Sequence, residues 1–273
     1  MQQYELSKVE LKEIQNIQLE MLHEIDRICR NHNIRYNIIA GTLLGAVRHK
    51  GYIPWDDDAD VALFREEYVK FREACEKTLD HSKYYFQDST NTVGYRWGYG
   101  KLRRKDSLFL RENQEHMPYE QGIFVDVFPL DNVPQKKLKR ELHNFHCFCI
   151  RKIMWSPVGK LDEKNCIKRL GYCLLAMVPE RKLIQHYEKF ISKSNRTDSE
   201  WVRILTFPTP TKDHGYRRCW YEESIQFEFE NQLLYGIKEW DDYLHFKFGN
   251  YLEIPAPEEQ KVHAITALRL PKA

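Results

Sequence analysis

The chain lacks a long hydrophobic run. Its longest uninterrupted apolar stretch is Cys173–Val178, far short of the ~20 residues that a membrane-spanning helix needs. The first residues, MQQYE, also lack the basic start and the apolar run of a secretory signal peptide. We therefore expect a cytoplasmic protein that does not cross a membrane.

An excess of charge of one sign is missing as well. Lys and Arg number 42 and Asp and Glu 40, which gives a formal net charge of +2. Such an even balance creates no global field that would favour a nucleic acid as partner, and any phosphate recognition must be local. The 7 cysteines are odd in number and scattered, which predicts reduced thiols instead of a disulfide framework.

What the chain does contain is enough apolar material for a packed core. It has 273 residues, of which 42% are hydrophobic and 13% aromatic. This length supports one large or two small domains, and the aromatic content excludes a disordered or low-complexity chain.

Apolar periodicity and turn residues predict the order of elements in the first half. An amphipathic helix is expected over 11–29 and a strand over 34–40, followed by a short helix at 43–48 and a strand ending near Leu63. A charged amphipathic helix follows at 65–78. Further strands are expected at 84–87, 94–103, 108–111 and 122–129. This order predicts a mixed α/β sheet.

The pattern changes near Pro134. Helices are expected at about 136–155, 165–177 and 180–194, and then a short strand at 224–230 and a helix at 238–248. We therefore predict a core over residues 1–134 and a largely helical region over 135–273. A segment near 222–252 is expected to pack back on the core.

Carboxylates gather before the strand that ends near Leu63. Because alternate side chains of a strand share a face, Asp58 and Asp60 would project together, with Asp56 beside them if the strand begins that early. Like charges this close are costly unless a cation lies between them, which suits Mg²⁺ or Mn²⁺ held by oxygen ligands. An acidic run is also typical of a solvated turn, so its neighbours decide the interpretation.

Two neighbours favour a site. Gly41 and Thr42 fall between a strand and a helix, where backbone N–H groups can receive a phosphate, Thr42 can cap the helix and Gly41 permits close approach. Asp126 lies inside an apolar strand, where a carboxylate needs a cation or hydrogen bonds. The alternative, that Asp126 faces solvent, is disfavoured because Phe124 and Phe128 share its face.

These elements together, Gly-Thr, Asp-x-Asp and a later strand Asp, are the pattern of the nucleotidyltransferase fold of polymerase β type. Residues 41–60, GTLLGAVRHKGYIPWDDDAD, closely resemble the signature of the LicD family. That family includes bacterial phosphocholine transferases and is related to fukutin and fukutin-related protein. Blocks at 101–103, 122–131 and 243–255 resemble its later motifs, and the resemblance is weakest over about 136–211.

The resemblance implies a reaction. It is the metal-dependent transfer of a phospho-substituent, phosphocholine first among them, from a CDP-activated donor such as CDP-choline. The acceptor would be a hydroxyl of a cell-surface glycan, such as lipopolysaccharide or teichoic acid, or of a lipid-linked precursor, with CMP released. The helical region would then bind the acceptor.

The resemblance also implies roles for particular residues. Asp58, Asp60 and Asp126 would be catalytic, and these three together with Asp56 would hold the metal. Contacts to the substrate would come from Gly41, Thr42, Arg48, Lys101 and Arg103. Lys101 and Arg103 share a strand face and could bind the diphosphate, although such residues are also typical of a plain surface.

The headgroup of the donor stays open at this point. A cage for choline would need several aromatic faces around one point, and Tyr95, Trp97, Tyr99 and Tyr119 are available for it. Ribitol phosphate and glycerol phosphate are the alternatives.

Two other functions also stay open. One is a nucleotidyltransferase that moves NMP from an NTP to a small molecule, and the other is a catalytically silent glycan-binding protein of the same fold. Apolar stretches beside basic residues at 146–155 and 168–177 suggest peripheral contact with the inner face of the membrane, although buried core helices have a similar pattern.

Overall fold

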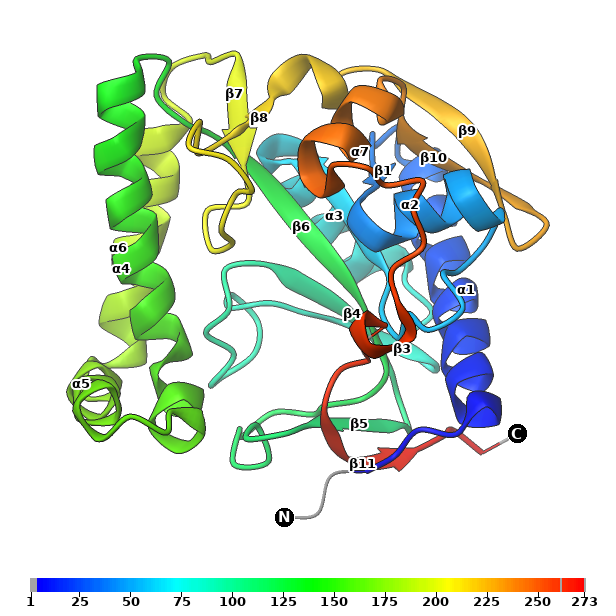
Figure 1. The fold of residues 1–273 in the computed structure, drawn as a ribbon, viewed down its shortest axis with the longest axis horizontal. Coiled ribbons are helices and arrows are strands. Elements are labelled where there is room, and N and C mark those ends of the chain that lie inside the picture. Colours follow the sequence, from blue (N-terminus) through cyan, green and yellow to red (C-terminus); the bar gives the residue numbers. More distant parts are fainter. Residues whose placement is uncertain (1–3, 261, 273) are drawn as a thin grey trace.

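A mixed β-sheet runs through the centre of the protein (Figure 1). The computed structural model describes residues 4–260 and 262–272, and within them this sheet has nine strands. Seven follow the spatial order β3-β4-β6-β2-β1-β10-β9, while β7 pairs with the end of β6 and β8 pairs with β7. The strands are β1 (Asn37–Ile38), β2 (Asp60–Phe64), β3 (Tyr84–Gln87), β4 (Gly100–Arg104), β6 (Phe124–Asn132), β7 (Trp201–Arg203), β8 (Tyr216–Arg217), β9 (Ser224–Phe229) and β10 (Gln232–Ile237).

Strand β6 lies inside the sheet, between β4 and β2, and every one of its residues is buried. It runs parallel to β2 and antiparallel to β4. A strand buried on both faces reads as a near-continuous apolar run, which is why the segment around 122–129 was predictable. The same burial makes each polar residue in β6 dependent on a partner.

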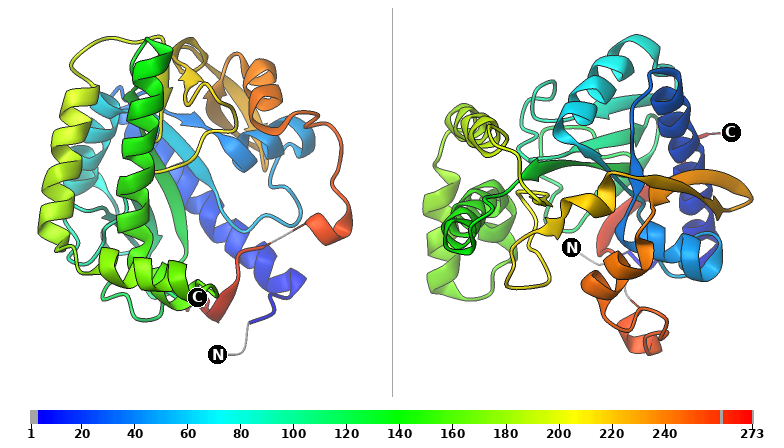
Figure 2. Two further views of the ribbon diagram at one scale, coloured as in Figure 1. Left: turned by 60° about the vertical axis from the view of Figure 1, so that its left-hand side comes forward. Right: turned by 90° about the horizontal axis from the view of Figure 1, so that it is seen from above.

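Helices cover both faces of this sheet. Seen from above in Figure 2, α1 (Lys8–Asn31) and α3 (Arg65–Thr78) lie on one face, and α2 (Ala40–His49) and α7 (Trp240–Phe248) lie on the other. Two short 3₁₀ helices, Arg218–Tyr221 and Pro257–Glu259, precede β9 and the C-terminal strand.

The first helix shows why local prediction succeeded here. Ser7 and Glu10 form a capping box at its start, in which each side chain bonds the backbone N–H of the other. Ile14, Met21 and Ile25 lie on its buried face, as the apolar periodicity predicts.

Three helices stand at one end of the sheet. They are α4 (Lys137–Asp162), α5 (Cys166–Ala176) and α6 (Glu180–Ser194), and α4 packs against both of the others. A separate two-stranded sheet joins β5 (Leu108–Arg111) to β11 (Ile265–Arg269), so the C-terminal segment returns to the first half of the chain. Within the described residues, no helix is both long and apolar enough to cross a membrane.

The fold is a mixed α/β structure, as predicted, but several boundaries differ. The strand expected over 34–40 contains two residues, β1, and the strand expected over 94–103 begins only at Gly100. The acidic run precedes β2, which starts at Asp60, so Asp56 and Asp58 lie in a loop. Helix α2 starts at Ala40, which places Gly41 and Thr42 in its first turn.

The second half of the chain contributes to the same sheet as the first. Strand β10, which the sequence analysis missed, pairs in parallel with β1 through Gly236 and Ile38, and β9 forms a hairpin with β10. The segment around 222–252 therefore lies against the first half. The division into a catalytic core over 1–134 and an acceptor-binding region over 135–273 remains a prediction.

Candidate active site

Strand register places Asp126 between Asp60 and Lys101. Asp60 of β2 is the parallel partner of Asp126 on β6, and Lys101 of β4 is its antiparallel partner on the other side. Paired residues of neighbouring strands point to the same face of a sheet. The Lys101 ammonium forms an ion pair with Oδ1 of Asp126. The buried carboxylate of β6 thus has the cationic partner that its position requires.

Two buried glutamines of α1 hold the acidic loop. Gln15 Nε2 donates to the carbonyl oxygen of Asp56 at 2.9 Å, and Gln18 Nε2 donates to that of Asp57 at 2.8 Å. Gln18 also reaches the carbonyl oxygen of Phe124 at 3.2 Å, which ties the loop to β6. Buried carbonyl groups need such partners. The sequence analysis missed both residues, although two glutamines beside an apolar helix stripe were a usable signal.

The first turn of α2 contacts the acidic residues directly. The hydroxyl of Thr42 accepts a hydrogen bond from the backbone N–H of Asp60 at 2.8 Å. A Cβ atom at Gly41 would lie 2.5 Å from Oδ2 of Asp56, so only glycine permits this approach. The expectation that Thr42 caps the helix is wrong, because the N-cap residue is Ile39 and Thr42 holds β2 instead.

Burial and neighbouring carboxylates together raise the pKa of Asp56, Asp58 and Asp60. The pKa of Asp56 is raised to about 8, that of Asp58 is raised, and that of Asp60 is well above its usual value. Burial is the largest cause in each case, and the nearby carboxylates add to it, with Asp126 acting on both Asp58 and Asp60. The four carboxylates that the sequence analysis grouped are therefore close enough for their charges to interact.

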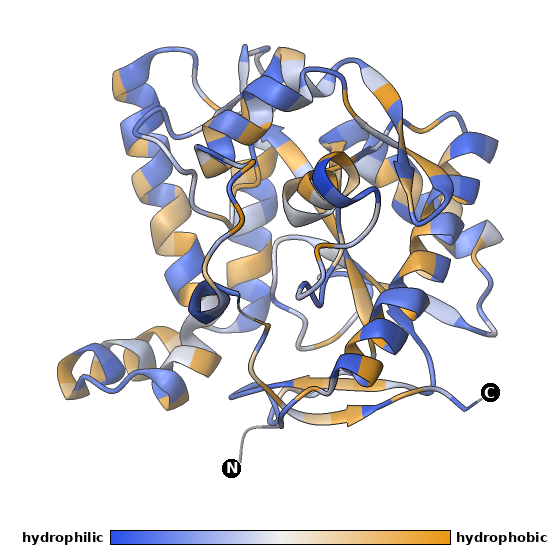
Figure 3. Cartoon of the chain, turned by 45° about the vertical axis from the view of Figure 1, so that its right-hand side comes forward, coloured by the Kyte–Doolittle hydropathy of each residue, from blue (hydrophilic) through white to orange (hydrophobic). Residues whose placement is uncertain are grey.

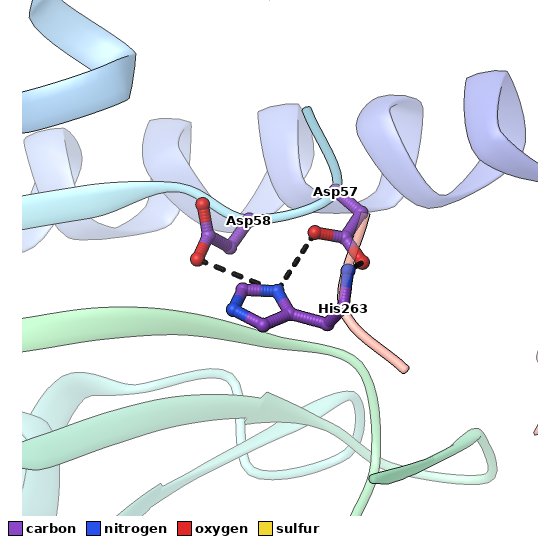
Figure 4. A group of neighbouring side chains, drawn as sticks. All are labelled: Asp57, Asp58 and His263. Atoms are coloured by element: carbon purple, nitrogen blue, oxygen red, sulfur yellow. Dashed lines mark hydrogen bonds and ion pairs between the residues drawn. The ribbon is translucent and has the colours of Figure 1, made fainter. Parts of the chain in front are cut away.

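A histidine from the C-terminal segment joins the acidic loop (Figure 4). His263 Nδ1 lies 2.8 Å from Oδ1 of Asp57 and 3.7 Å from Oδ2 of Asp58, and its backbone N–H donates to Oδ2 of Asp57 at 2.9 Å. Among the described residues, these three side chains form the one group of three or more potential ligand atoms lying within 4.8 Å of one another. The sequence analysis missed Asp57 and His263 as neighbours because they are far apart along the chain.

The carboxylate oxygens of the acidic loop and of the neighbouring strands are donors that suit a divalent cation. Carboxylate oxygens are the ligands that Mg²⁺ and Mn²⁺ prefer, and the repulsion between them falls when a cation is bound. His263 lowers the pKa of Asp58, and Lys247 on α7 opposes the rise in the pKa of Asp60. Burial nevertheless raises the pKa of both carboxylates more than these cations lower it, so the cluster can accept further positive charge.

Two predicted substrate contacts on β4 have different surroundings. Lys101 is buried beside Asp126, and burial lowers its pKa to about 7. Arg103 is also buried, and it donates from Nε to Gln87 Oε1 at 2.7 Å and from Nη1 to the carbonyl oxygen of Gly122 at 2.7 Å. These bonds join Arg103 to its own sheet, so its contact with substrate stays a prediction.

Arg48 lies at the other end of α2. Its Nη1 donates to the carbonyl oxygens of Tyr251 at 2.9 Å and Glu253 at 3.2 Å. The residue therefore connects α2 to the loop that follows α7. A role in binding the donor phosphates likewise remains a prediction for Arg48.

An aromatic pocket opens beside Lys101. Its cavity volume is about 370 Å³, and its aromatic lining residues are Trp97, Tyr99, Trp155, Tyr172 and Phe207. Two of the four aromatics that the sequence analysis considered are therefore brought together. The other two, Tyr95 and Tyr119, are not among the lining residues but pack on each other, and the Tyr119 hydroxyl accepts a hydrogen bond from Trp97 Nε1 at 2.8 Å.

Comparison with known proteins shows which family this chain resembles. Residues 33–161 match the model of a family described as LicD/FKTN/FKRP, nucleotidyltransferase domain. The lipopolysaccharide cholinephosphotransferase LicD of Haemophilus influenzae is 24% identical over 270 residues, which cover 95% of this chain and 98% of that protein.

Two uncharacterized proteins are similar over shorter stretches. RP689 of Rickettsia prowazekii is 27% identical over 112 residues, covering 40% of this chain and 39% of that protein. RT0683 of Rickettsia typhi is 41% identical over 54 residues, covering 20% of this chain and 18% of that protein.

The mixed sheet and the clustered carboxylates define a protein with a nucleotidyltransferase-like core. Over residues 33–161 the chain carries a LicD-family domain, which confirms the family predicted from the motif at 41–60. Similarity to a named phosphotransferase along nearly the whole chain also confirms the prediction of an enzyme of this class.

Proposed function

We propose that this protein transfers phosphocholine from CDP-choline to a hydroxyl of lipopolysaccharide or a lipid-linked glycan precursor and releases CMP. The observation that carries the proposal is the meeting of Asp60, Asp126 and Lys101 on neighbouring strands, with Asp56 and Asp58 beside them. The choice of choline is supported by similarity to a lipopolysaccharide cholinephosphotransferase over 95% of the chain.

In the proposed reaction the acceptor oxygen attacks the phosphorus atom that carries choline. The bond from that phosphorus to the bridging oxygen of the diphosphate breaks, and CMP leaves with the electron pair. Because Lys101 bonds Oδ1 of Asp126, we assign Oδ2 of Asp126 as the atom that accepts the proton of the acceptor hydroxyl.

Four carboxylates would hold the cation, Mg²⁺ or Mn²⁺: Asp56, Asp58, Asp60 and Asp126. Such an ion supplies neutralisation of the charge that develops on the donor phosphates. The chain's own residues keep these ligands in place. Thr42 positions the backbone of Asp60, while the glutamines Gln15 and Gln18 of α1 fix the acidic loop.

The deciding experiment measures CMP release with Mg²⁺ and lipopolysaccharide as acceptor. CDP-choline, CDP-ribitol and CDP-glycerol are compared as donors, and Asp58→Asn and Asp126→Asn are run beside the native protein. We expect release from CDP-choline and loss of it in both variants. CMP release from CDP-ribitol or CDP-glycerol, without release from CDP-choline, would show that the headgroup is a polyol instead of choline.

Two other outcomes would overturn the proposal. Transfer of NMP from a labelled NTP, without CMP release from any CDP-alcohol, would identify a nucleotidyltransferase acting on a small molecule. Glycan binding without either reaction would identify a catalytically silent protein of this fold.

We also propose that α5 contacts a membrane surface that carries the acceptor. None of its residues is buried. Ile167, Leu170 and Leu174 are exposed at helical spacing, which places them on one side of the helix. Lys168 and Arg169 lie on the same helix, which favours an anionic leaflet over a protein surface. Figure 3 shows the apolar positions along this helix at the edge of the molecule.

Vesicle flotation tests this contact. We expect the protein to float with phosphatidylglycerol vesicles and to stay behind with phosphatidylcholine vesicles. Leu174→Asp should reduce flotation, whereas Leu233→Asp, at a similarly exposed leucine on β10, should leave it unchanged. Equal loss in both variants, or no flotation of the native protein, would contradict the proposal.

A further inference from the structure

The aromatic pocket beside Lys101 has a strongly positive lining. Besides the rings named above, its walls include Lys101, Arg111, Arg151 and Lys152, and none of the described residues that line it is acidic. We refer to it as the aromatic–cationic pocket. A cavity of about 370 Å³ with this lining fits a small molecule that combines a flat ring with negative charge.

The pocket adjoins the carboxylate cluster through Lys101. Lys101 lines the pocket and also pairs with Asp126. Arg111 lines it too, and its charge lowers the pKa of both Lys101 and Asp58, so its guanidinium lies near both regions. A ligand in the pocket can therefore place its anionic part next to the carboxylates that would hold the cation.

The aromatic walls offer faces for a planar ring. Tyr99 and Phe207 meet edge to face with their ring centroids 5.3 Å apart. Trp97 and Trp155, which also line the pocket, have ring centroids 5.8 Å apart at an interplanar angle of 48°. Aromatic side chains of this kind bind nucleobases by stacking.

The same lining disfavours a quaternary ammonium group. Cages for such cations use aromatic faces without competing positive charge. Here Lys152 already lies over the ring of Tyr172, 5.3 Å from its centroid, and Lys101 lies 5.3 Å from the centroid of Tyr99. The positive side chains thus occupy the aromatic faces that a choline group would need, and they repel it.

We propose that the aromatic–cationic pocket binds the cytidine diphosphate part of the donor and excludes the choline group. The pyrimidine lies against the aromatic walls, and the diphosphate extends toward Lys101 and Arg111. This assignment rests on the proposed function, which supplies a CDP-activated donor, and it places the headgroup and the acceptor outside the pocket.

Tryptophan fluorescence of the full chain tests the assignment, because Trp97 and Trp155 lie in the pocket walls. The probes are CDP, choline and glucose 6-phosphate, each titrated with and without Mg²⁺. We expect saturable quenching by CDP and none by choline. Tighter binding of glucose 6-phosphate than of CDP would assign the pocket to an anionic acceptor sugar and overturn the proposal, as would saturable binding of choline.

Matched variants locate the binding. Arg151→Gln removes one cation from the pocket and should weaken CDP binding by about tenfold, as expected for a charged hydrogen bond. Arg181→Gln, at an exposed arginine on α6, should leave it unchanged. Trp155→Leu, checked for folding by circular dichroism, should weaken it as well. CDP binding at native strength in both pocket variants would overturn the assignment.

The pocket assignment and the proposed function can fail separately. If CDP binds as expected but no CDP-alcohol yields CMP, the reaction is wrong and the pocket assignment stands. If CDP-choline yields CMP while the pocket variants bind CDP like the native chain, the reaction stands and the pocket assignment is wrong.

Discussion

The carboxylate cluster and the aromatic–cationic pocket are neighbours with opposite charge and different construction. The cluster comes from two strands and the loop before one of them, and strand register aligns Asp60 with Asp126. The pocket is assembled from side chains near residues 97–114, 151–172 and 206–208. Lys101 belongs to both.

This difference indicates how a donor could be oriented. A polyanion is repelled by the cluster unless a cation is bound there, whereas the pocket attracts it without one. The boundary at Lys101 is then the natural place for a diphosphate. Each prediction below changes one side of the boundary and leaves the other intact.

The largest expected effect comes from the cluster. Asp60→Asn should lower the rate of CMP release by about a thousandfold or more, because it removes a cation ligand next to the reacting phosphate. Steady-state CMP release checks this result. Asp242→Asn, at an exposed aspartate on α7, is the control and should be fully active. If the rate of Asp60→Asn stayed within tenfold of the native rate, Asp60 would not be a catalytic residue.

A smaller loss is expected at Gly41. A Cβ atom there would lie 2.5 Å from Oδ2 of Asp56, so Gly41→Ala displaces this carboxylate. We expect a fall in kcat of about tenfold to a hundredfold, the usual cost of a displacement near 1 Å. Gly171→Ala on α5 is the matched control, since nothing lies within 4 Å of its Cβ position. Equal activity of both variants would contradict the close approach of Asp56.

Divalent cations should stabilise the native protein and not the cluster variants. We expect Mg²⁺ or Mn²⁺ to raise the free energy of unfolding by about 1–3 kcal/mol at saturating concentration. Thermal melts with EDTA and with added cation measure the shift. In Asp60→Asn the shift should shrink, while Arg151→Gln in the pocket should keep it. A shift of native size in Asp60→Asn would argue against a cation site there.

The smallest predicted effect concerns pH. His143 lies on α4, the helix that also carries Arg151, and burial lowers its pKa from 6.5 to about 4. Between these values the unfolded chain binds a proton that the folded chain does not, so stability falls as the pH falls. Acidification from pH 7 to pH 5 should therefore cost about 1–2 kcal/mol through this residue.

The carboxylate cluster contributes a pH dependence of stability that is opposite to that of His143. Burial raises the pKa of Asp56 to about 8, so in metal-free protein its contribution improves as the pH falls below that value. Melting temperatures across pH 5–8 in EDTA check both signs. His143→Gln should remove part of the acid sensitivity, and Asp56→Asn should increase it. If both variants changed the acid sensitivity of the melting temperature in the same direction, the opposite pH dependences assigned to His143 and Asp56 would be contradicted.

Much of the fold was predictable because it depends on local pattern. The apolar stripe of 11–29 defines α1, the apolar run of 122–129 defines most of β6, and the helices near 180–194 and 238–248 lie close to their predicted positions. Strands β1 and β10 were misjudged because their pairing joins Ile38 to Gly236, and no local pattern contains that contact.

The candidate site, like the fold, has features that local sequence predicts and features that depend on distant contacts. By itself the sequence determined which carboxylates to predict as site residues, those at 56, 58, 60 and 126, because a motif of adjacent residues and an acid in an apolar strand are both local features. Only the tertiary structure decided that Lys101 neutralises Asp126, that His263 meets Asp57, and that Trp97 and Trp155 share a pocket. These contacts join distant segments, and they form only when packing of the whole chain brings the segments together.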